Sequence, residues 1–177
     1  MNFLIFFENE ISVDKKNAKI TDKERISYIK EKFVLEKGNS QNAGIFEGNL
    51  GIAIFKGENE KGELEFDVDF SKVPLKKNNI EILISVCRPQ TNKKIFHIAQ
   101  SFGVKEISFV KANNIPKSYL TSKSLEKENI LRECLLAMEQ TGDTIMPKVN
   151  TVPTLNHNLH EDDRESQTVQ GNTYQGM

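Results

Sequence analysis

The sequence lacks the features that mark membrane, secreted and metal-cluster proteins. No apolar run approaches the roughly 20 residues that a membrane span needs. The apolar start, MNFLIFFENE, has no basic leader and meets an acidic residue at once, so it predicts a strand and not a secretory signal. The two cysteines, Cys87 and Cys134, have no metal-ligand spacing, which favours buried reduced thiols. We therefore expect a cytoplasmic protein without a membrane partner.

An excess of charge of one sign is also missing. The formal net charge is -1 over 177 residues, so composition gives no global electrostatic case for nucleic acid. Any RNA surface must then be a local basic patch. The length allows one domain of ordinary size or two small ones, and a hydrophobic content of 37% can support a core.

Residues 1–73 predict a small β-barrel built from short strands and one helix. Phe3–Phe7 is a compact apolar strand, and Glu63–Phe70 alternates apolar and polar residues along another. Between them, the run AGIFEGNLGIAIF predicts a strand pair in which Gly48 and Gly51 flank or form a tight turn.

The helix of this first part has a start signal and an apolar stripe. Thr21 and Glu24 have the spacing of a capping box, and Gly38 is the expected end. The stripe that should face the core comprises Ile26, Ile29 and Phe33.

Residues 80–150 predict an α/β unit that follows a polar linker, PLKKNN, at 74–79. Ile80–Val86 is nearly continuously apolar, as expected for a strand buried on both faces of a parallel sheet. A helix from about Asn92 to Phe102 and a strand at Ile107–Val110 complete a strand, helix, strand unit. The helix residues expected to face inward are Ile95, Ile98, Ala99 and Phe102.

The stretch from Ser118 to Val149 contains an amphipathic helix that ends in a polar corner. Gly142 can adopt the left-handed conformation that ends a helix, and Pro147 prevents its resumption. The apolar face comprises Ile130, Leu131, Cys134, Leu135 and Met138. The candidate active-site corner comprises Glu139, Gln140, Thr141, Asp143 and Thr144. A capped helix with a solvated corner is the alternative, because turns favour the same residue types.

A second candidate site lies where the strands of the α/β unit end. Open α/β sheets bind ligands at this edge, so side chains here could contact phosphate groups. The candidate RNA-binding residues are Arg88, Lys93, Lys94, Lys117 and Tyr119. Lysines that are merely solvated are the alternative. His97 lies among apolar neighbours, which favours a hydrogen-bonded packing residue over a base.

Residues 151–177 are polar and show no apolar period, which predicts a disordered tail. His157 and His160 lie close to three acidic residues at 161–163, an arrangement that invites a metal hypothesis. Histidines in a flexible tail bind metals adventitiously more often than functionally. We therefore expect no dedicated metal site.

Two runs carry a resemblance to a known family. SYLTSKSL followed by LAMEQTGDTIMPKV, and RPQTNKKIFHIAQSFGVKEISFV at 88–110, resemble segments of the small-subunit ribosomal RNA uridine-N3 methyltransferases, a family of the SPOUT class. The similarity extends over the chain up to Val149. It implies an α+β and α/β chain with a PUA-like, RNA-binding β-barrel at 1–73 and a SPOUT-type methyltransferase domain at 80–150. It also implies S-adenosylmethionine as methyl donor, 16S ribosomal RNA or the small ribosomal subunit as partner, and a homodimer.

The chain departs from this family at informative places. Tyr28 stands where the family usually has histidine, Val34 where it has arginine, and Ser101 where it commonly has glutamate. The family binds its cofactor in a C-terminal trefoil knot with a proline-glutamate-glycine loop, and neither this loop nor G-x-G-x-x-G occurs here. We therefore expect a partial SPOUT domain that lacks the knot, has no visible cofactor-binding residues and is not competent alone. The alternatives are a non-catalytic RNA-binding or ribosome-associated module and an inactive remnant.

Overall fold

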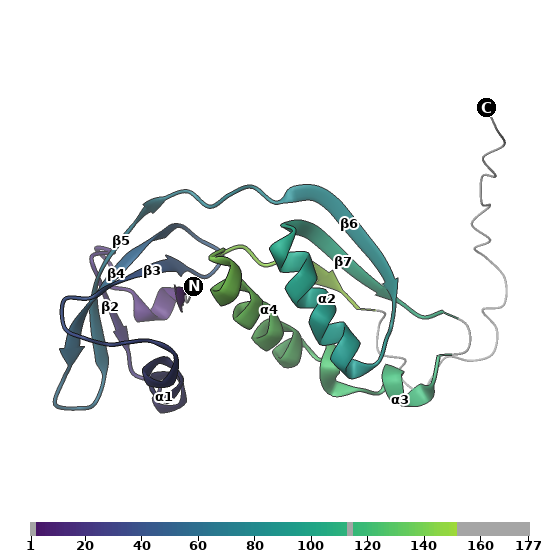
Figure 1. Cartoon of the computed structure of the whole chain (residues 1–177), viewed down its shortest axis with the longest axis horizontal. Coiled ribbons are helices and arrows are strands. Elements are labelled where there is room, and N and C mark those ends of the chain that lie inside the picture. The colour runs from purple at the N-terminus through teal and green to yellow at the C-terminus, as the bar shows by residue number, and fades with distance from the viewer. Residues whose placement is uncertain (1–2, 113–114, 152–177) are drawn as a thin grey trace.

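The computed structural model describes residues 3–112 and 115–151 and contains two β-sheets (Figure 1). A curled five-stranded sheet has the order β1-β3-β4-β5-β2, and a three-stranded parallel sheet has the order β6-β7-β8. This mixed α+β architecture agrees with the predicted class. Most of the predicted tail, with His157 and His160, lies outside the described residues.

In the curled sheet, β2, β4 and β5 alternate between the core and the solvent, whereas β1 is buried throughout. Its strands are β1 (Leu4–Phe6), β2 (Asn17–Ile20), β3 (Ser40–Ile45), β4 (Leu50–Glu58) and β5 (Leu64–Lys72). The predicted inward face of β5 is confirmed, because Leu64, Phe66, Val68 and Phe70 are all buried. Gly51 allows β4 to approach β5, since a Cβ there would lie 1.7 Å from the Asp69 carbonyl oxygen.

Helix α1 (Lys23–Lys32) follows β2 and covers this core. Its apolar stripe is as predicted, but both ends differ. The N-cap is Asp22, whose carboxylate accepts from the backbone N–H of Arg25 at 2.8 Å, so the capping box at Thr21 and Glu24 was wrong by one residue. Asp is a stronger N-cap than Thr. The helix ends well before Gly38, because Phe33 adopts extended backbone and buries its ring.

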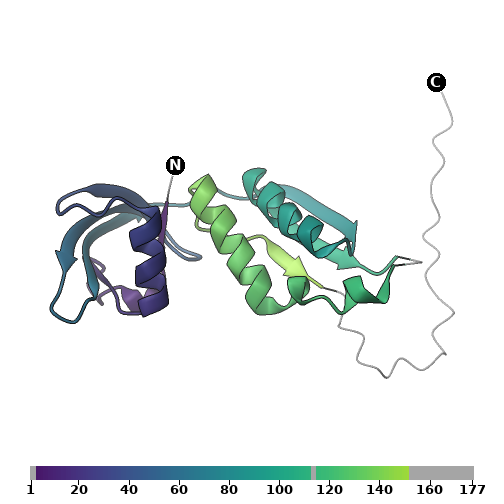
Figure 2. The same ribbon diagram turned by 60° about the horizontal axis from the view of Figure 1, so that its bottom comes forward.

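The second part packs helices on one face of the parallel sheet (Figure 2). Strand β6 (Asn78–Ser85), helix α2 (Pro89–Ser101) and strand β7 (Val104–Val110) form the predicted strand, helix, strand unit. The short helices α3 (Lys117–Leu120) and η2 (Lys123–Leu125) lead into α4 (Lys127–Thr141), which is followed by β8 (Lys148–Asn150). Another short 3-10 helix, η1 (Glu8–Glu10), follows β1.

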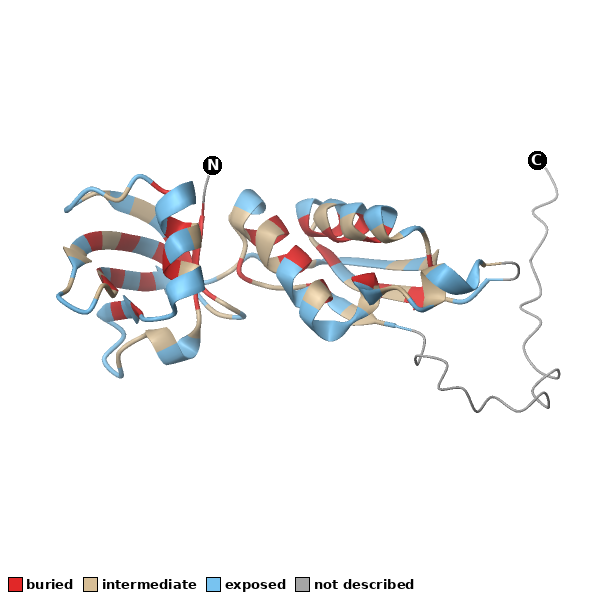
Figure 3. Ribbon diagram, turned by 90° about the horizontal axis from the view of Figure 1, so that it is seen from below, coloured by how far each residue is buried: buried red, intermediate tan, exposed pale blue. Residues whose placement is uncertain are grey.

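Burial in this part departs from the prediction in two ways (Figure 3). Strand β6 is not buried on both faces: Leu83 is 72% exposed and Ile80 46%, because α2 and α4 lie on the same side of the sheet. Helix α2 is also turned about its axis, so that Ile98 and Phe102 are exposed. The residues of α2 that are buried are Asn92, Ile95, Phe96, Ala99 and Gln100.

Packing explains why α2 is rotated about its axis relative to the prediction. The helix contacts α4 and η2 as well as the sheet, so its buried stripe is wider than one strand-facing row. Asn92 belongs to this second contact, since its Nδ2 donates to Ser124 Oγ at 3.0 Å. The buried face of α4 also differs from the predicted one. Leu131, predicted to be buried, is partly exposed, whereas Glu133 and Ala137 are buried in addition to the predicted residues.

The two sheets join through β1 and the end of α4. Phe3, Ile5 and Met138 form a small buried cluster between them, and the Phe3 N–H donates to the Glu139 carbonyl at 3.1 Å. Among the described helices, none has the length and apolar character that crossing a bilayer requires. The predicted polar corner therefore lies at the junction of the sheets.

Candidate functional site

The polar corner lies where α4 ends, and Gly142 adopts the predicted left-handed conformation there (φ 70°). Its side chains do not converge on one cavity. Glu139 and Thr144 contact the curled sheet and α1, whereas Asp143 contacts the parallel-sheet part. Gln140 is exposed, and the Thr141 hydroxyl donates to the Ala137 carbonyl at 3.0 Å.

Glu139 is partly buried between α4 and α1. The Tyr28 hydroxyl donates to Glu139 Oε2 at 2.5 Å. Burial raises the pKa of Glu139, and the Tyr28 hydrogen bond only partly opposes that rise. Tyr28, which stands where the resembling family has histidine, thus contacts the junction.

Thr144 fastens the segment after α4 to the turn between β3 and β4. It is fully buried, and its hydroxyl donates to the Gly48 carbonyl at 2.5 Å. The Glu47 N–H donates to the Thr144 carbonyl at 2.8 Å, and Glu47 Oε1 accepts from the Met146 N–H at 2.8 Å. Thr144 and Glu139 therefore hold the two sheets together.

Asp143 is the most connected residue of the corner. Its Oδ1 accepts from the backbone N–H groups of Thr144 and Ile145, at 2.7 and 3.0 Å. Its Oδ2 pairs with Lys77 Nζ at 2.7 Å and accepts from Gln100 Nε2 at 2.8 Å. Both oxygens of the Asp143 carboxylate are therefore occupied by donors from within the fold.

A depression of about 590 Å³ opens beside Asp143. Its walls are residues 75–78, the end of α2 at 100–103 and the end of α4 at 141–143. Sequence reasoning missed Lys77 and Gln100 here. Gln100 lies four positions after the apolar Phe96, on the same face of the helix, and this spacing was the signal that could have identified it.

The second predicted site lies at the other end of the parallel sheet, at the carboxyl ends of the strands. The structure brings together Arg88 and Tyr119, because Arg88 Nε donates to the Tyr119 hydroxyl at 2.9 Å. Lys117 is exposed at the start of α3, and Lys94 is exposed on α2. These four side chains remain available to a ligand.

Lys93 differs from them because it is paired within the fold. Its Nζ lies 2.7 Å from Glu133 Oε1, on the neighbouring helix α4. Burial acts to raise the pKa of Glu133, but the Lys93 ion pair outweighs it and the pKa is lowered. His97 is half-buried, and its Nε2 lies 3.7 Å from Glu133 Oε2, on the far side of the carboxylate from Lys93.

Charge is unevenly distributed along the chain. Residues 88–127 contain eight lysines and arginines but only two acidic residues, Glu106 and Glu126. Residues 1–73 contain eleven basic and fourteen acidic residues. The excess of positive charge along the sequence therefore lies in the second part, and the curled sheet carries none.

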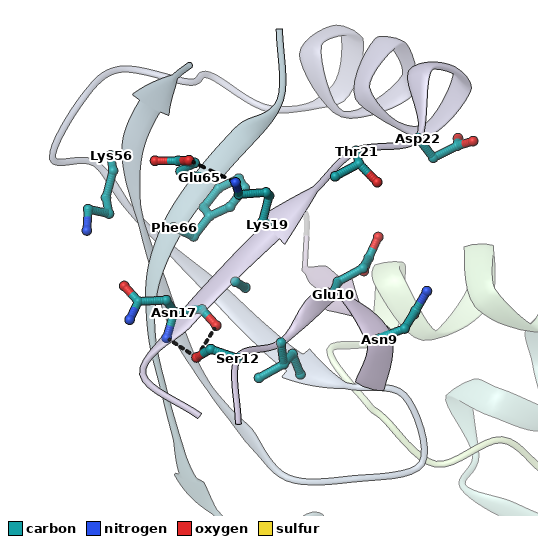
Figure 4. Close-up of a pocket in the computed structure, with 12 residues that line it drawn as sticks. Asn9, Glu10, Ser12, Asn17, Lys19, Thr21, Asp22, Lys56, Glu65 and Phe66 are labelled. Carbon is teal, nitrogen blue, oxygen red and sulfur yellow. Dashed lines mark hydrogen bonds and ion pairs between the residues drawn. The ribbon is translucent and has the colours of Figure 1, made fainter. Parts of the chain in front are cut away.

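A depression of about 510 Å³ on the curled sheet illustrates this balance (Figure 4). Its lysines are paired with carboxylates: Lys19 lies 3.4 Å from Glu65, and Lys56 lies 3.0 Å from Asp67. Glu10, whose pKa is raised by burial, lies 2.8 Å from Arg25. With its charges neutralised in this way, the depression offers little attraction for phosphate.

Within 3–112 and 115–151, no three His, Cys, Asp or Glu side chains are grouped to hold a metal ion. Neither depression lies at the carboxyl ends of β6, β7 and β8. Arg88 and Lys117 at that edge are cations, which repel a sulfonium group.

Comparison with known proteins identifies a family and several solved structures with a similar fold. The protein-family model described as RNA methyltransferase domain matches residues 74–172 of this chain. No curated protein sequence matches the chain.

Three solved structures are similar to the chain at 12 to 16% identity. A ribosomal RNA small subunit methyltransferase E from Neisseria gonorrhoeae, bound to S-adenosyl methionine, has 16% identity and a TM-score of 0.61 over 86% of this chain and 62% of that one. A predicted RNA methyltransferase from Thermotoga maritima has 13% identity and a TM-score of 0.58, over 86% of this chain and 65% of that one. A putative methyltransferase from Legionella pneumophila, in complex with the same cofactor, has 12% identity and a TM-score of 0.58, over 85% of this chain and 63% of that one. The chain thus shares their fold and spans less than two thirds of their length.

Proposed function

Because this chain belongs to the RNA methyltransferase domain family, we propose that it acts in the S-adenosylmethionine-dependent methylation of ribosomal RNA, at N3 of a uridine in 16S RNA. The family match supports the reaction class. The similarity to the Neisseria small-subunit enzyme supports the RNA and the methyl donor. In this proposal the described residues supply RNA contacts.

One observation carries the RNA-binding role: the basic edge formed by Arg88, Lys94, Lys117 and Tyr119. The guanidinium of Arg88 is oriented by Tyr119 and can bind a phosphate through two parallel N–H groups. Lys94 and Lys117 add exposed point charges. Phosphate contacts of this kind position an RNA strand without reading its sequence.

The basic edge predicts a salt-dependent affinity for RNA. We expect the double variant Arg88→Ala/Lys117→Ala to bind a 16S RNA fragment more weakly, with the slope of log K against log salt reduced by roughly 0.7 to 0.9 for each phosphate that is no longer neutralised. Fluorescence anisotropy over a salt series measures both. Lys37→Ala, at an exposed lysine of the curled-sheet part, is the matched control and should leave the slope unchanged. Equal slopes for all three proteins would contradict the proposal.

The methyl donor is tested separately by calorimetric titration with S-adenosylmethionine. Micromolar binding supports the methyltransferase role. Failure to bind, from a folded chain that still binds RNA, favours the second candidate, a non-catalytic RNA-binding module. The position of the described depressions, away from the carboxyl ends of the strands, is the observation that favours this alternative.

The finer assignments belong to the same proposal. We assign residues 1–73 to a PUA-like domain, 74–79 to a linker and 80–150 to a SPOUT-type domain, as the resemblance predicts. The corner at 139–144 is assigned to the junction of the sheets, since its carboxylates are already hydrogen-bonded. The cytoplasmic location and the homodimer stay predictions, and light scattering measures the latter.

A further inference from the structure

We infer that the depression beside Asp143 binds one nucleobase of single-stranded RNA, with the base stacked on Phe102 and its polar edge directed to Gln100. The inference rests on the proposed function, because it takes RNA as the ligand. It concerns a different place on the molecule, since the depression lies at the amino ends of β6 and β7. The basic edge lies about 25 Å away, along the eight residues of β6.

Phe102 supplies a stacking surface. It caps the end of α2, is 67% exposed and has no aromatic partner among the described residues. Leu75, which is 83% exposed, lines the same depression and adds a second apolar surface. Proteins that bind single-stranded RNA commonly stack unpaired bases on exposed aromatic rings.

Gln100 supplies an unmatched acceptor. It is only 2% exposed, and its Nε2 donates to Asp143 Oδ2 at 2.8 Å and to the Ile145 carbonyl at 3.1 Å. These two bonds fix the carboxamide, so that Oε1 is buried without a partner in the described part of the chain. A buried acceptor of this kind is uncommon and favours a ligand that donates.

The donors on nucleobases suit this acceptor. The N3–H of uracil and the amino groups of adenine and cytosine can each donate to a carboxamide oxygen. Because Oε1 is closed off from water, a lining side chain must move before a base reaches it.

Lysines at the rim suit the phosphates that flank such a base. Lys76 is exposed on the linker, and Lys77 lies beside it, paired with Asp143. Both line the depression. A flanking phosphate can therefore contact Lys76 without breaking the Lys77 ion pair.

The sequence contains no tryptophan, so Phe102→Trp introduces a single fluorophore at the stacking surface. We expect its emission to be quenched when heptamers of uridylate or adenylate are added. Val13→Trp, at a fully exposed position of the curled-sheet part, is the matched control and should not respond. Inorganic phosphate should quench neither, and quenching by phosphate alone would overturn the stacking model.

Affinity tests the same site without a fluorophore. Phe102→Ala should weaken binding of the labelled heptamer by about 5- to 100-fold, as expected for loss of one stacked base. Leu75→Ala, at another exposed position, should weaken it less. Circular dichroism confirms that both variants are folded, and unchanged affinity of folded Phe102→Ala overturns the inference.

The outcomes separate this inference from the proposed function. If the heptamer binds and the Arg88→Ala/Lys117→Ala variant loses that binding, while Phe102→Trp gives no response, the nucleobase site is wrong and the RNA-binding proposal stands. If no RNA binds to the folded chain, both are wrong. Quenching of Phe102→Trp that persists in the double variant supports a separate nucleobase site.

Discussion

At the scale of single residues, the notable feature is a set of polar groups that the fold buries. Glu139 and Asp143 occupy neighbouring positions, yet their surroundings differ. Asp143 has four donors, whereas Glu139 accepts only the Tyr28 hydroxyl and is partly removed from water. Glu139 therefore combines burial with a single hydrogen-bond donor.

The raised pKa of Glu139 predicts how the variant Glu139→Gln depends on pH. A carboxyl group whose pKa is higher in the folded state favours folding fully below its unfolded value of about 4.5, and this contribution is lost as pH rises through the folded pKa. Glutamine mimics the neutral form at every pH. Relative to the wild type, the variant should thus be more stable at pH 7 than at pH 4, by urea unfolding.

Tyr28→Phe provides the control for that experiment. It removes the hydrogen bond to Glu139 and should cost about 1 to 2 kcal/mol at pH 7, where the buried carboxylate loses its donor. A Glu139→Gln effect that is the same at both pH values would mean that burial does not govern this carboxyl group.

Cys134 should be unreactive in the folded protein. It is fully buried, and burial raises its pKa to about 12. At pH 8 only roughly one thiol in 10⁴ is then the reactive thiolate. In Cys87→Ser, Ellman's reagent should detect no thiol until denaturant is added, and then one. Rapid labelling of the native variant would contradict the burial of Cys134.

At the scale of elements, α4 is defined by its end as much as by its apolar face. Gly142 at φ 70° lets the chain turn towards Asp143 and Thr144, and the Gly142 N–H donates to the Met138 carbonyl at 2.8 Å. A residue with a Cβ is strained in this conformation. The contacts of the corner therefore depend on this glycine.

Gly142→Ala should destabilise the protein by about 1 to 2 kcal/mol, because alanine adopts the left-handed conformation poorly. Gly142→Asn is the matched control and should cost less, since asparagine tolerates that conformation. Guanidinium unfolding measures both. Equal losses would point to crowding by the Phe3 ring, which lies 3.7 Å from where the new Cβ would be, and not to backbone strain.

At the scale of the whole molecule, the two sheets share a small interface at the end of α4. Met138 is fully buried there against Phe3 and Ile5 of the first part, and Thr144 bonds to Gly48. An interface of this size should make the two parts unfold together only while its packing is intact.

Met138→Ala should weaken that coupling. Removing a buried methionine costs about 2 to 5 kcal/mol. We expect calorimetry to show one thermal transition for the wild type and two, or one much broader, for the variant. Ile130→Ala, which lies in the core of the second part only, should lower the transition temperature of that part. A single sharp transition for Met138→Ala would show that the interface does not couple the parts.

The sequence by itself determined most elements of the fold. Local periodicity of apolar residues predicted three features of the fold: the alternation in β5, the apolar stripe of α1, and the strand, helix, strand unit around α2. The left-handed turn at Gly142 was likewise predictable, because glycine is the residue that adopts it without strain. The resemblance to RNA methyltransferases also depended on contiguous runs.

The tertiary structure alone decided which side chains meet. Glu139 finds Tyr28 across 111 positions of sequence, and Lys93 is removed from the basic edge by Glu133 on a neighbouring helix. The contact with α4 sets which face of α2 is buried. Phe102 is therefore exposed, although the sequence pattern predicted that it faces inward. These outcomes depend on packing between distant elements, which periodicity along one segment does not encode.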